Sequence, residues 1–126
     1  MKQTASVVKP VTLNSKTINL EVGAIVVSNS GILPIFYKVL SLSDKRIGLI
    51  HLNSVDLQDT TVHKSYRRVA PGDIRTNFKG DVIAEEIKMN YSVLDWGGIQ
   101  VSGQHGSAIR LLTMYDPTEK YLWGQD

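Results

Sequence analysis

The side chains with the clearest capacity for chemistry lie in a basic stretch, residues 60–79. It holds one acid, Asp73, and six basic or imidazole side chains: His63, Lys64, Arg67, Arg68, Arg75 and Lys79. Tyr66 lies among these cations, where its ring can stack on a base while the cations contact phosphates. The pattern predicts a binding surface for nucleic acid or a nucleotide. The alternative is structural: Tyr66 packs on the edge of the core, and the charges form a solvated rim.

Two basic residues from neighbouring predicted strands complete this candidate surface. The full set expected to contact nucleic acid or a nucleotide is Lys38, Arg46, Lys64, Tyr66, Arg67, Arg68 and Arg75. Side chains alternate along a strand, so a strand over residues 60–69 places Lys64, Tyr66 and Arg68 on one face.

Aromatic side chains in the C-terminal third form a second candidate site. Tyr115, Tyr121 and Trp123 combine apolar rings with polar groups, a composition favoured at protein interfaces. A terminal segment this apolar must bury itself on its own domain or on a neighbour. We expect Tyr121 and Trp123 to dock on their own chain, and we expect Trp96 to cap the core at a turn.

The sequence offers no arrangement typical of catalysis or of metal binding. His51, His63 and His105 lack the spacing of a zinc site, and the chain has no cysteine. Glu85 and Glu86 are adjacent, so they face different directions and do not form a catalytic dyad. The glycine patterns of nucleotide-binding enzymes are absent too. We therefore expect a non-enzymatic protein with no catalytic residue, no metal and no cofactor.

Short β-type runs are the elements that must position these residues. Runs at residues 22–27, 36–42 and 46–52 follow one another closely, and residues 43–45 are typical of a tight hairpin. Alternating apolar and polar residues on both sides of residues 14–16 predict another hairpin. This spacing is typical of a small, strongly bent antiparallel sheet. The expected fold is mainly β: a small SH3-like barrel or a β-roll with at most one short helix.

The second half of the chain is predicted as strands and turns, with one ambiguous segment. We expect strands over residues 60–69, 99–102 and 108–115, and a turn over residues 71–73. Residues 81–89 fit either a short helix or a strand. Good helix formers in the middle of this segment favour the helix.

Length and composition bound the organisation of the chain. We expect one domain over residues 1–126, with residues 1–9 frayed and residues 117–126 as a C-terminal tail. The formal net charge of +2 is too small by itself to imply nucleic acid. The start lacks the apolar segment of a secretory signal, and no apolar run approaches the length of a membrane span. We expect a cytoplasmic protein with no membrane partner.

Several short patterns resemble a group of small proteins encoded by bacteriophages and other mobile elements. In chain order they are Val22-Gly23-x-Ile25-x-Val27, Phe36-Tyr37-x-Val39, Val69-Ala70-Pro71, Ile99-Gln100-Val101-Ser102 and Tyr121-Leu122-Trp123. The chain departs from the group at Ala24, where an acid is usual, and at residues 28–32, which replace an aromatic loop. The resemblance implies a phage-type accessory protein with an SH3-like core, acting in a bacterial host cell.

Two functions from different classes follow as hypotheses. The first is a non-enzymatic accessory protein that binds nucleic acid or a nucleotide through its basic β face. The alternative is a small phage-encoded inhibitor that docks on a host defence or nuclease protein through a sheet edge or the C-terminal aromatics. A virion structural protein is a further alternative, and exposed sheet edges also allow a homo-oligomer.

Overall fold

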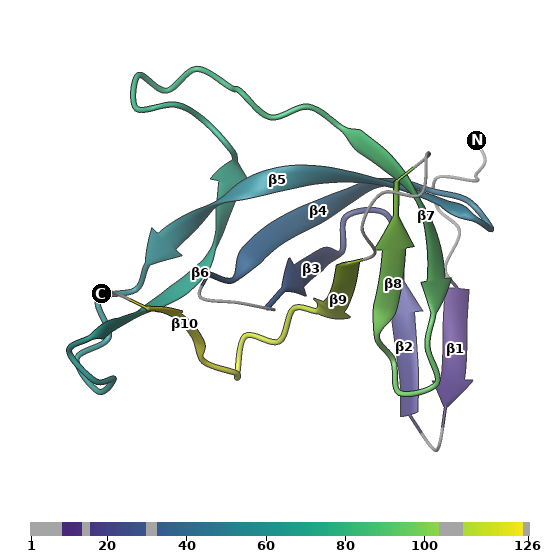
Figure 1. Cartoon of the computed structure of the whole chain (residues 1–126), viewed down its shortest axis with the longest axis horizontal. Helices are drawn as coiled ribbons and strands as arrows, with labels where there is room; N and C mark the ends of the chain where they lie inside the picture. The colour runs from purple at the N-terminus through teal and green to yellow at the C-terminus, as the bar shows by residue number, and fades with distance from the viewer. Residues whose placement is uncertain (1–8, 14–15, 30–32, 104–109, 125–126) are drawn as a thin grey trace.

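The computed structural model describes residues 9–13, 16–29, 33–103 and 110–124 (Figure 1). Over these residues the chain forms ten strands and no helix. In chain order they are β1 (Lys9–Leu13), β2 (Lys16–Leu20), β3 (Ile25–Ser28), β4 (Ile35–Leu42), β5 (Arg46–Asp56), β6 (Tyr66–Ile74), β7 (Ile87–Val93), β8 (Ile99–Ser102), β9 (Arg110–Met114) and β10 (Tyr121–Gly124). The prediction of a mainly β fold is confirmed.

Six of these strands close into a barrel. Around the ring the order is β5, β4, β3, β9, β8 and β7, all neighbours are antiparallel, and the pairing of β7 with β5 closes the ring. The separate hairpin of β1 and β2 brings Leu20, which is fully buried, into the barrel core. A barrel, as one of the two expectations has it, is therefore present, and its SH3-like character stays a prediction.

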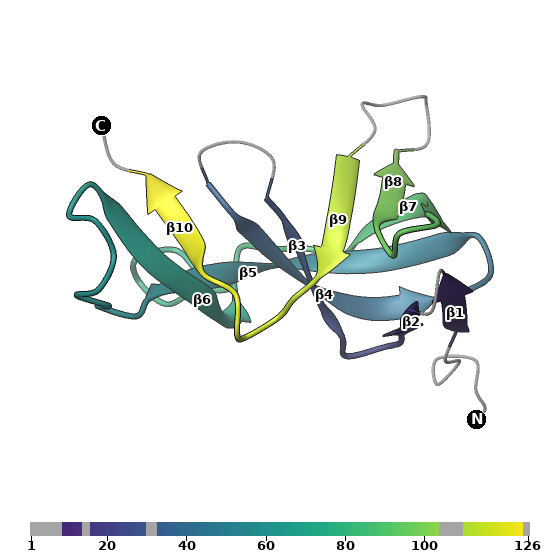
Figure 2. The same ribbon diagram turned by 90° about the horizontal axis from the view of Figure 1, so that it is seen from below.

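Strand β5 pairs with two different strands along one of its edges. One edge pairs with β4, while the other pairs first with β7, where Leu49 lies opposite Ile87, and then with β6, where Leu52 lies opposite Ile74. Strand β10 pairs with β6 in turn. We call β6 and β10 the wing; Figures 1 and 2 show it at the end of the molecule away from β7 and β8.

The wing creates a second hydrophobic core beside that of the barrel. Successive side chains of a strand point to opposite faces, so Val26 and Tyr37 enter the barrel core, while their neighbours Val27 and Phe36 enter the second core. Leu52, Val69 and Tyr121 complete the second core. Burial on both faces explains why β3 and the start of β4 lack a polar alternation.

Two polar side chains lie close over the backbone at Gly48 in β5. Ser41 Oγ donates a hydrogen bond to Glu86 Oε2 (2.7 Å), and this carboxylate lies over Gly48 in β5. A Cβ atom at position 48 would collide with both side chains.

The helix expected over residues 81–89 is wrong. Residues 87–93 form β7, which is hydrogen-bonded to β5 on one side and to β8 on the other, and residues 83–86 have no regular structure. Pairing along both edges outweighs a helix propensity worth only tenths of a kcal/mol per residue, roughly up to 0.7.

The predicted bounds of β6 are also wrong. Residues 60–65 form turns, and the strand continues through residues 71–73, which were expected as a turn. Pro71 lies opposite Ser54, beside a register shift in β5, and such an irregularity tolerates a residue without an N–H.

Other expectations for the elements are confirmed. Residues 43–45 join β4 to β5, residues 99–102 form β8, and β1 pairs with β2 as a hairpin. The tail docks on its own chain as β10. The turn residues 14–15, the N-terminal residues 1–8 and the first two residues of the strand expected over residues 108–115 lie outside the described part of the chain.

Candidate functional site

A narrow hairpin arm, residues 75–83, projects between β6 and β7 where β5 changes partner (Figure 1). A β-bridge between Thr76 and Val82 joins its two sides. The N–H of Ile83 also donates a hydrogen bond to the carbonyl of Arg75 (3.0 Å). The arm is therefore an ordered hairpin and not a loose connection.

The tip of the arm holds one aromatic side chain out of the protein. Asn77 Oδ1 accepts hydrogen bonds from the N–H groups of Lys79 (2.8 Å) and Asp81 (3.0 Å), and the Asn77 N–H donates to the Asp81 carbonyl (2.9 Å). Gly80 completes the turn at φ +91°, a conformation that favours glycine. The Phe78 side chain lies on this braced turn and is 96% exposed.

A groove of about 780 Å³ is lined by residues of the arm from Arg75 to Phe78. Four large apolar side chains line it and are all exposed: Leu33, Val55, Phe78 and Trp123. They come from the segment before β4, from β5, from the arm and from β10. The groove therefore joins the barrel, the arm and the wing in one apolar surface.

Polar side chains also line the groove. Arg75 Nη1 lies 3.2 Å from His51 Nδ1, and the His51 ring lies 5.5 Å from the Tyr37 ring. Asn53 Oδ1 accepts a hydrogen bond from the Thr76 N–H (3.2 Å), which fixes the base of the arm. Partial burial, together with the Arg75 charge, lowers the pKa of His51 below its usual 6.5. The ring is therefore neutral at pH 7, and its Nδ1 accepts from Arg75.

The two arginines at the centre of the predicted basic surface form ion pairs within the chain. Arg67 Nη1 lies 3.2 Å from Asp56 Oδ2, and Arg68 Nη1 lies 3.2 Å from Asp59 Oδ2. Both acids belong to the end of β5 and the loop that follows it. These pairs offset much of the positive charge that the sequence places in this region.

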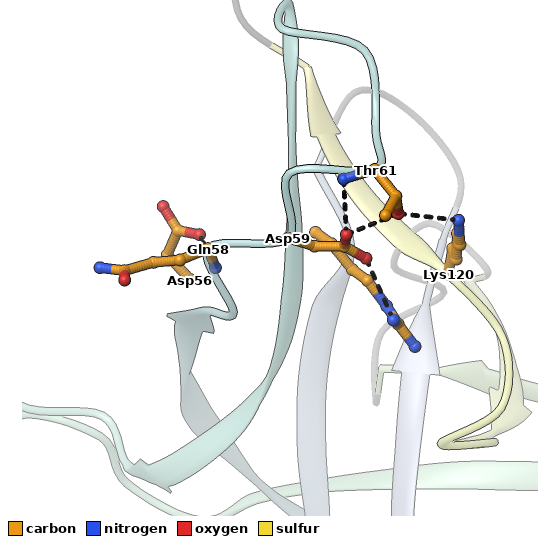
Figure 3. A network of polar contacts seen from close by, with 6 residues as sticks. Asp56, Gln58, Asp59, Thr61 and Lys120 are labelled. Carbon is orange, nitrogen blue, oxygen red and sulfur yellow. Dashed lines mark hydrogen bonds and ion pairs between the residues drawn. The ribbon is translucent and has the colours of Figure 1, made fainter.

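A polar network holds the Asp59 carboxylate in its charged form (Figure 3). The Thr61 hydroxyl and N–H donate to Asp59 Oδ1 at 2.6 and 2.8 Å, and Lys120 Nζ donates to the Thr61 hydroxyl at 3.5 Å. The hydrogen bonds from Thr61, aided by that from Arg68, lower the pKa of Asp59 from 3.8 to about 2. The acid therefore stays ionised and paired over the whole physiological range.

The seven residues predicted for nucleic acid do not form one surface. Four of them lie near one another in the chain: Lys64 in the turn before β6, and Tyr66, Arg67 and Arg68 at its start. Arg46 begins β5, whereas β6 pairs with the other end of β5, roughly 30 Å away along that strand. Its Nε atom is buried and makes no hydrogen bond within the described residues. Lys38 is exposed on β4, and Arg75 lies in the arm.

The aromatic residues predicted as a protein interface divide between core and surface. Tyr121 is 3% exposed, and its ring packs edge to face against Phe36 with centroids 5.6 Å apart. Its hydroxyl accepts a hydrogen bond from the Asp116 N–H (3.0 Å). Tyr115 packs beside it, whereas Trp123 is 41% exposed and lines the groove. Trp123 is thus the member of this set that a partner reaches most easily.

Trp96 lies half exposed at the turn between β7 and β8, with its ring folded over Gly98. The described residues contain no group of three His, Cys, Asp or Glu side chains that could hold a metal ion. No helix long and apolar enough to cross a membrane occurs among these same residues.

The sequence reasoning missed Phe78 and the groove beside it. The local signal is Asn77 followed by Gly80, a turn pattern with an aromatic residue inside it. An aromatic side chain in a turn is exposed unless another element covers it. No family model, curated protein or solved structure matches this chain.

Proposed function

We propose that this chain is a non-enzymatic accessory protein, of the phage or mobile-element type, that docks on another protein through its arm. The observation that carries the proposal is the exposure of Phe78, 96%, on a turn braced by the Asn77 side chain. A turn already ordered before binding saves the entropy cost of ordering it on association. Large aromatic side chains of this kind are frequent anchors of protein interfaces.

The surroundings of Phe78 support protein docking more than nucleic-acid binding. The exposed apolar residues beside it extend the contact area into the groove, as the core of an interface requires. Binding of nucleic acid needs a continuous series of free cations. The four basic-face residues in β6 and its preceding loop include two arginines already paired with Asp56 and Asp59. Nucleic-acid binding and an SH3-like form of the barrel remain predictions from the sequence.

Photo-crosslinking tests the proposal even though the partner is unidentified. The photoreactive residue p-benzoylphenylalanine is placed at Phe78 in one tagged variant and at Trp96, an exposed aromatic position on the β7–β8 turn, in a matched control. Each variant is irradiated in a bacterial lysate with and without nuclease. We expect a discrete protein adduct from position 78, unchanged by nuclease and absent from position 96.

Other patterns would contradict arm docking. Equal adducts from both positions would indicate nonspecific contact, and adducts lost with nuclease would favour the nucleic-acid hypothesis. A Phe78→Ala variant serves as a second check. The Phe78 side chain is almost fully exposed, so the free energy of unfolding of this variant should differ from that of the wild type by less than about 0.5 kcal/mol. Capture of the partner should nevertheless be lost.

A further inference from the structure

Among the described residues, the lining of the groove combines apolar side chains, neutral polar side chains and one strong cation. Among the described residues that line it, Leu33, Val55 and Trp123 give the apolar part, and Arg75 gives the positive charge. No aspartate or glutamate of the described part of the chain belongs to this lining. The groove is therefore complementary to an apolar group that carries a negative charge beside it.

Arg75 is held in place without being neutralised. Its Nη1 atom contacts His51 Nδ1 (3.2 Å), and no carboxylate of the described residues forms an ion pair with it. Arg67 and Arg68 are the contrast, since each contacts an aspartate. The His51 ring is itself fixed against Tyr37. Arg75 thus keeps its charge and most of its donors for a ligand.

We propose that the groove binds an extended peptide segment of a partner protein in which a carboxylate neighbours a large apolar side chain. Arg75 pairs with the carboxylate, and the apolar side chain packs against Leu33, Val55 and Trp123. The inference rests on the proposed function and names the chemistry of the docking partner. Phe78, which also lines the groove, contacts the partner at the tip of the arm.

The shape and charge of the groove favour a peptide over other ligands. Its volume of about 780 Å³ is within the usual range for binding sites. Small-molecule sites, however, bury most of the ligand, and the Phe78 wall is 96% exposed, so it does not enclose one. A nucleic-acid strand would need a row of cations to follow its phosphates, and the groove offers Arg75 as its one strong cation among the described residues.

Peptide selection tests this chemistry on the whole protein. A phage-displayed library of random peptides is panned on the immobilised wild-type chain and, in parallel, on Arg75→Glu. We expect the wild type to enrich peptides with Asp or Glu beside Trp, Phe, Leu or Ile. The charge-reversed variant should enrich Lys or Arg at the same place instead, because like charges now exclude the acid.

One selected peptide then gives the size of the contact. By fluorescence anisotropy, Arg75→Gln should weaken its binding about tenfold, as expected for loss of a charge-assisted hydrogen bond. Changing the acidic residue of the peptide to its amide should weaken binding by the same factor. The amide peptide and Arg75→Gln together should weaken binding little more than either change alone. Arg46→Gln, at the far end of β5, is the matched control and should leave the affinity unchanged.

Several outcomes would overturn the inference. The wild type could enrich peptides without acidic residues, whose affinity Arg75→Gln leaves unchanged. It could instead enrich basic peptides, or enrich no peptide at all. A 20-nucleotide oligo-dT that displaces the peptides would indicate nucleic acid in the groove. A stable dimer by light scattering, dispersed by Phe78→Ala, would show that a second copy covers it. If crosslinking from Phe78 still succeeds, such failures refute the peptide chemistry alone and leave arm docking intact.

Discussion

Removing the Asn77 side chain should disorder the tip of the arm while leaving the barrel folded. Asn77 Oδ1 accepts two backbone hydrogen bonds, from Lys79 (2.8 Å) and Asp81 (3.0 Å). Each bond contributes about 0.5–1.5 kcal/mol, so Asn77→Ala should loosen the turn locally by about 1–3 kcal/mol. That shifts the equilibrium between closed and open turn by a factor of about 5–150. Binding through Phe78 weakens by as much as the closed turn is depopulated.

Amide hydrogen exchange measured by NMR tests this reasoning directly. In Asn77→Ala the N–H groups of Lys79 and Asp81 should exchange about tenfold faster or more, because both lose their acceptor. The global free energy of unfolding, measured with urea, should change by less than about 0.5 kcal/mol, because the tip does not contact either core. Asn19→Ala, an exposed asparagine of β2, controls for loss of an asparagine side chain.

Unchanged exchange at Lys79 and Asp81 would refute the claim that Asn77 braces the turn. A large loss of global stability would refute the claim that the arm is independent of the barrel. Asn77→Asp retains an oxygen acceptor at the same position, so it should keep more of the protection than Asn77→Ala.

Gly48→Ala should lower the free energy of unfolding in urea by about 1 kcal/mol, because the new Cβ displaces the Glu86 carboxylate. The double variant Gly48→Ala/Glu86→Ala should lose less stability than the two single variants added together. Strict additivity of the two losses would argue against the contact. Tyr121→Phe should cost about 1 kcal/mol because a backbone N–H loses its acceptor, and an unchanged unfolding midpoint would contradict this. Asp59 has a folded pKa of about 2 against 3.8 unfolded, so the stability it contributes is complete above pH 3.8 and is lost as the pH falls toward 2. In Asp59→Asn that acid-sensitive part should vanish from the pH–stability curve. The pKa of His51 also falls on folding, so the stability that its neutral ring contributes is complete above pH 6.5 and declines as the pH drops below that value. A pH–stability curve of His51→Gln that matches the wild-type curve below pH 6.5 would refute this assignment.

The strands of the barrel could be predicted because they carry local signals. The turn at residues 43–45 and the apolar runs on both sides place β4 and β5 within a few residues. The sequence left residues 81–89 open between a helix and a strand and favoured the helix. The choice depends on pairing of residues 87–93 with β5 and β8, which local propensity does not report. Pro71 misled for the same reason, since a register shift in β5 permits it within β6.

The candidate site was harder to predict than the fold. The basic residues were visible in the sequence, but Asp56 and Asp59, which pair with Arg67 and Arg68, are brought close by folding. Phe78 is exposed because no other segment packs over it, and this depends on the tertiary fold. Sequence patterns, in contrast, indicate which residues are buried. The groove combines side chains from four separate segments, so no local pattern could have indicated it.

The arm connects β6 to β7, two strands that pair with the same edge of β5, and this makes the arm exchangeable. Ile74 and Ile87 lie opposite Leu52 and Leu49 on the same edge of one strand, so the ends of the excursion are fixed close together whatever lies between them. The entropy of closing such a loop rises only slowly with its length. Segments of different length and sequence can therefore be grafted between these two positions while barrel and wing keep their registers. The scaffold can change its binding specificity by replacing a single continuous stretch of chain.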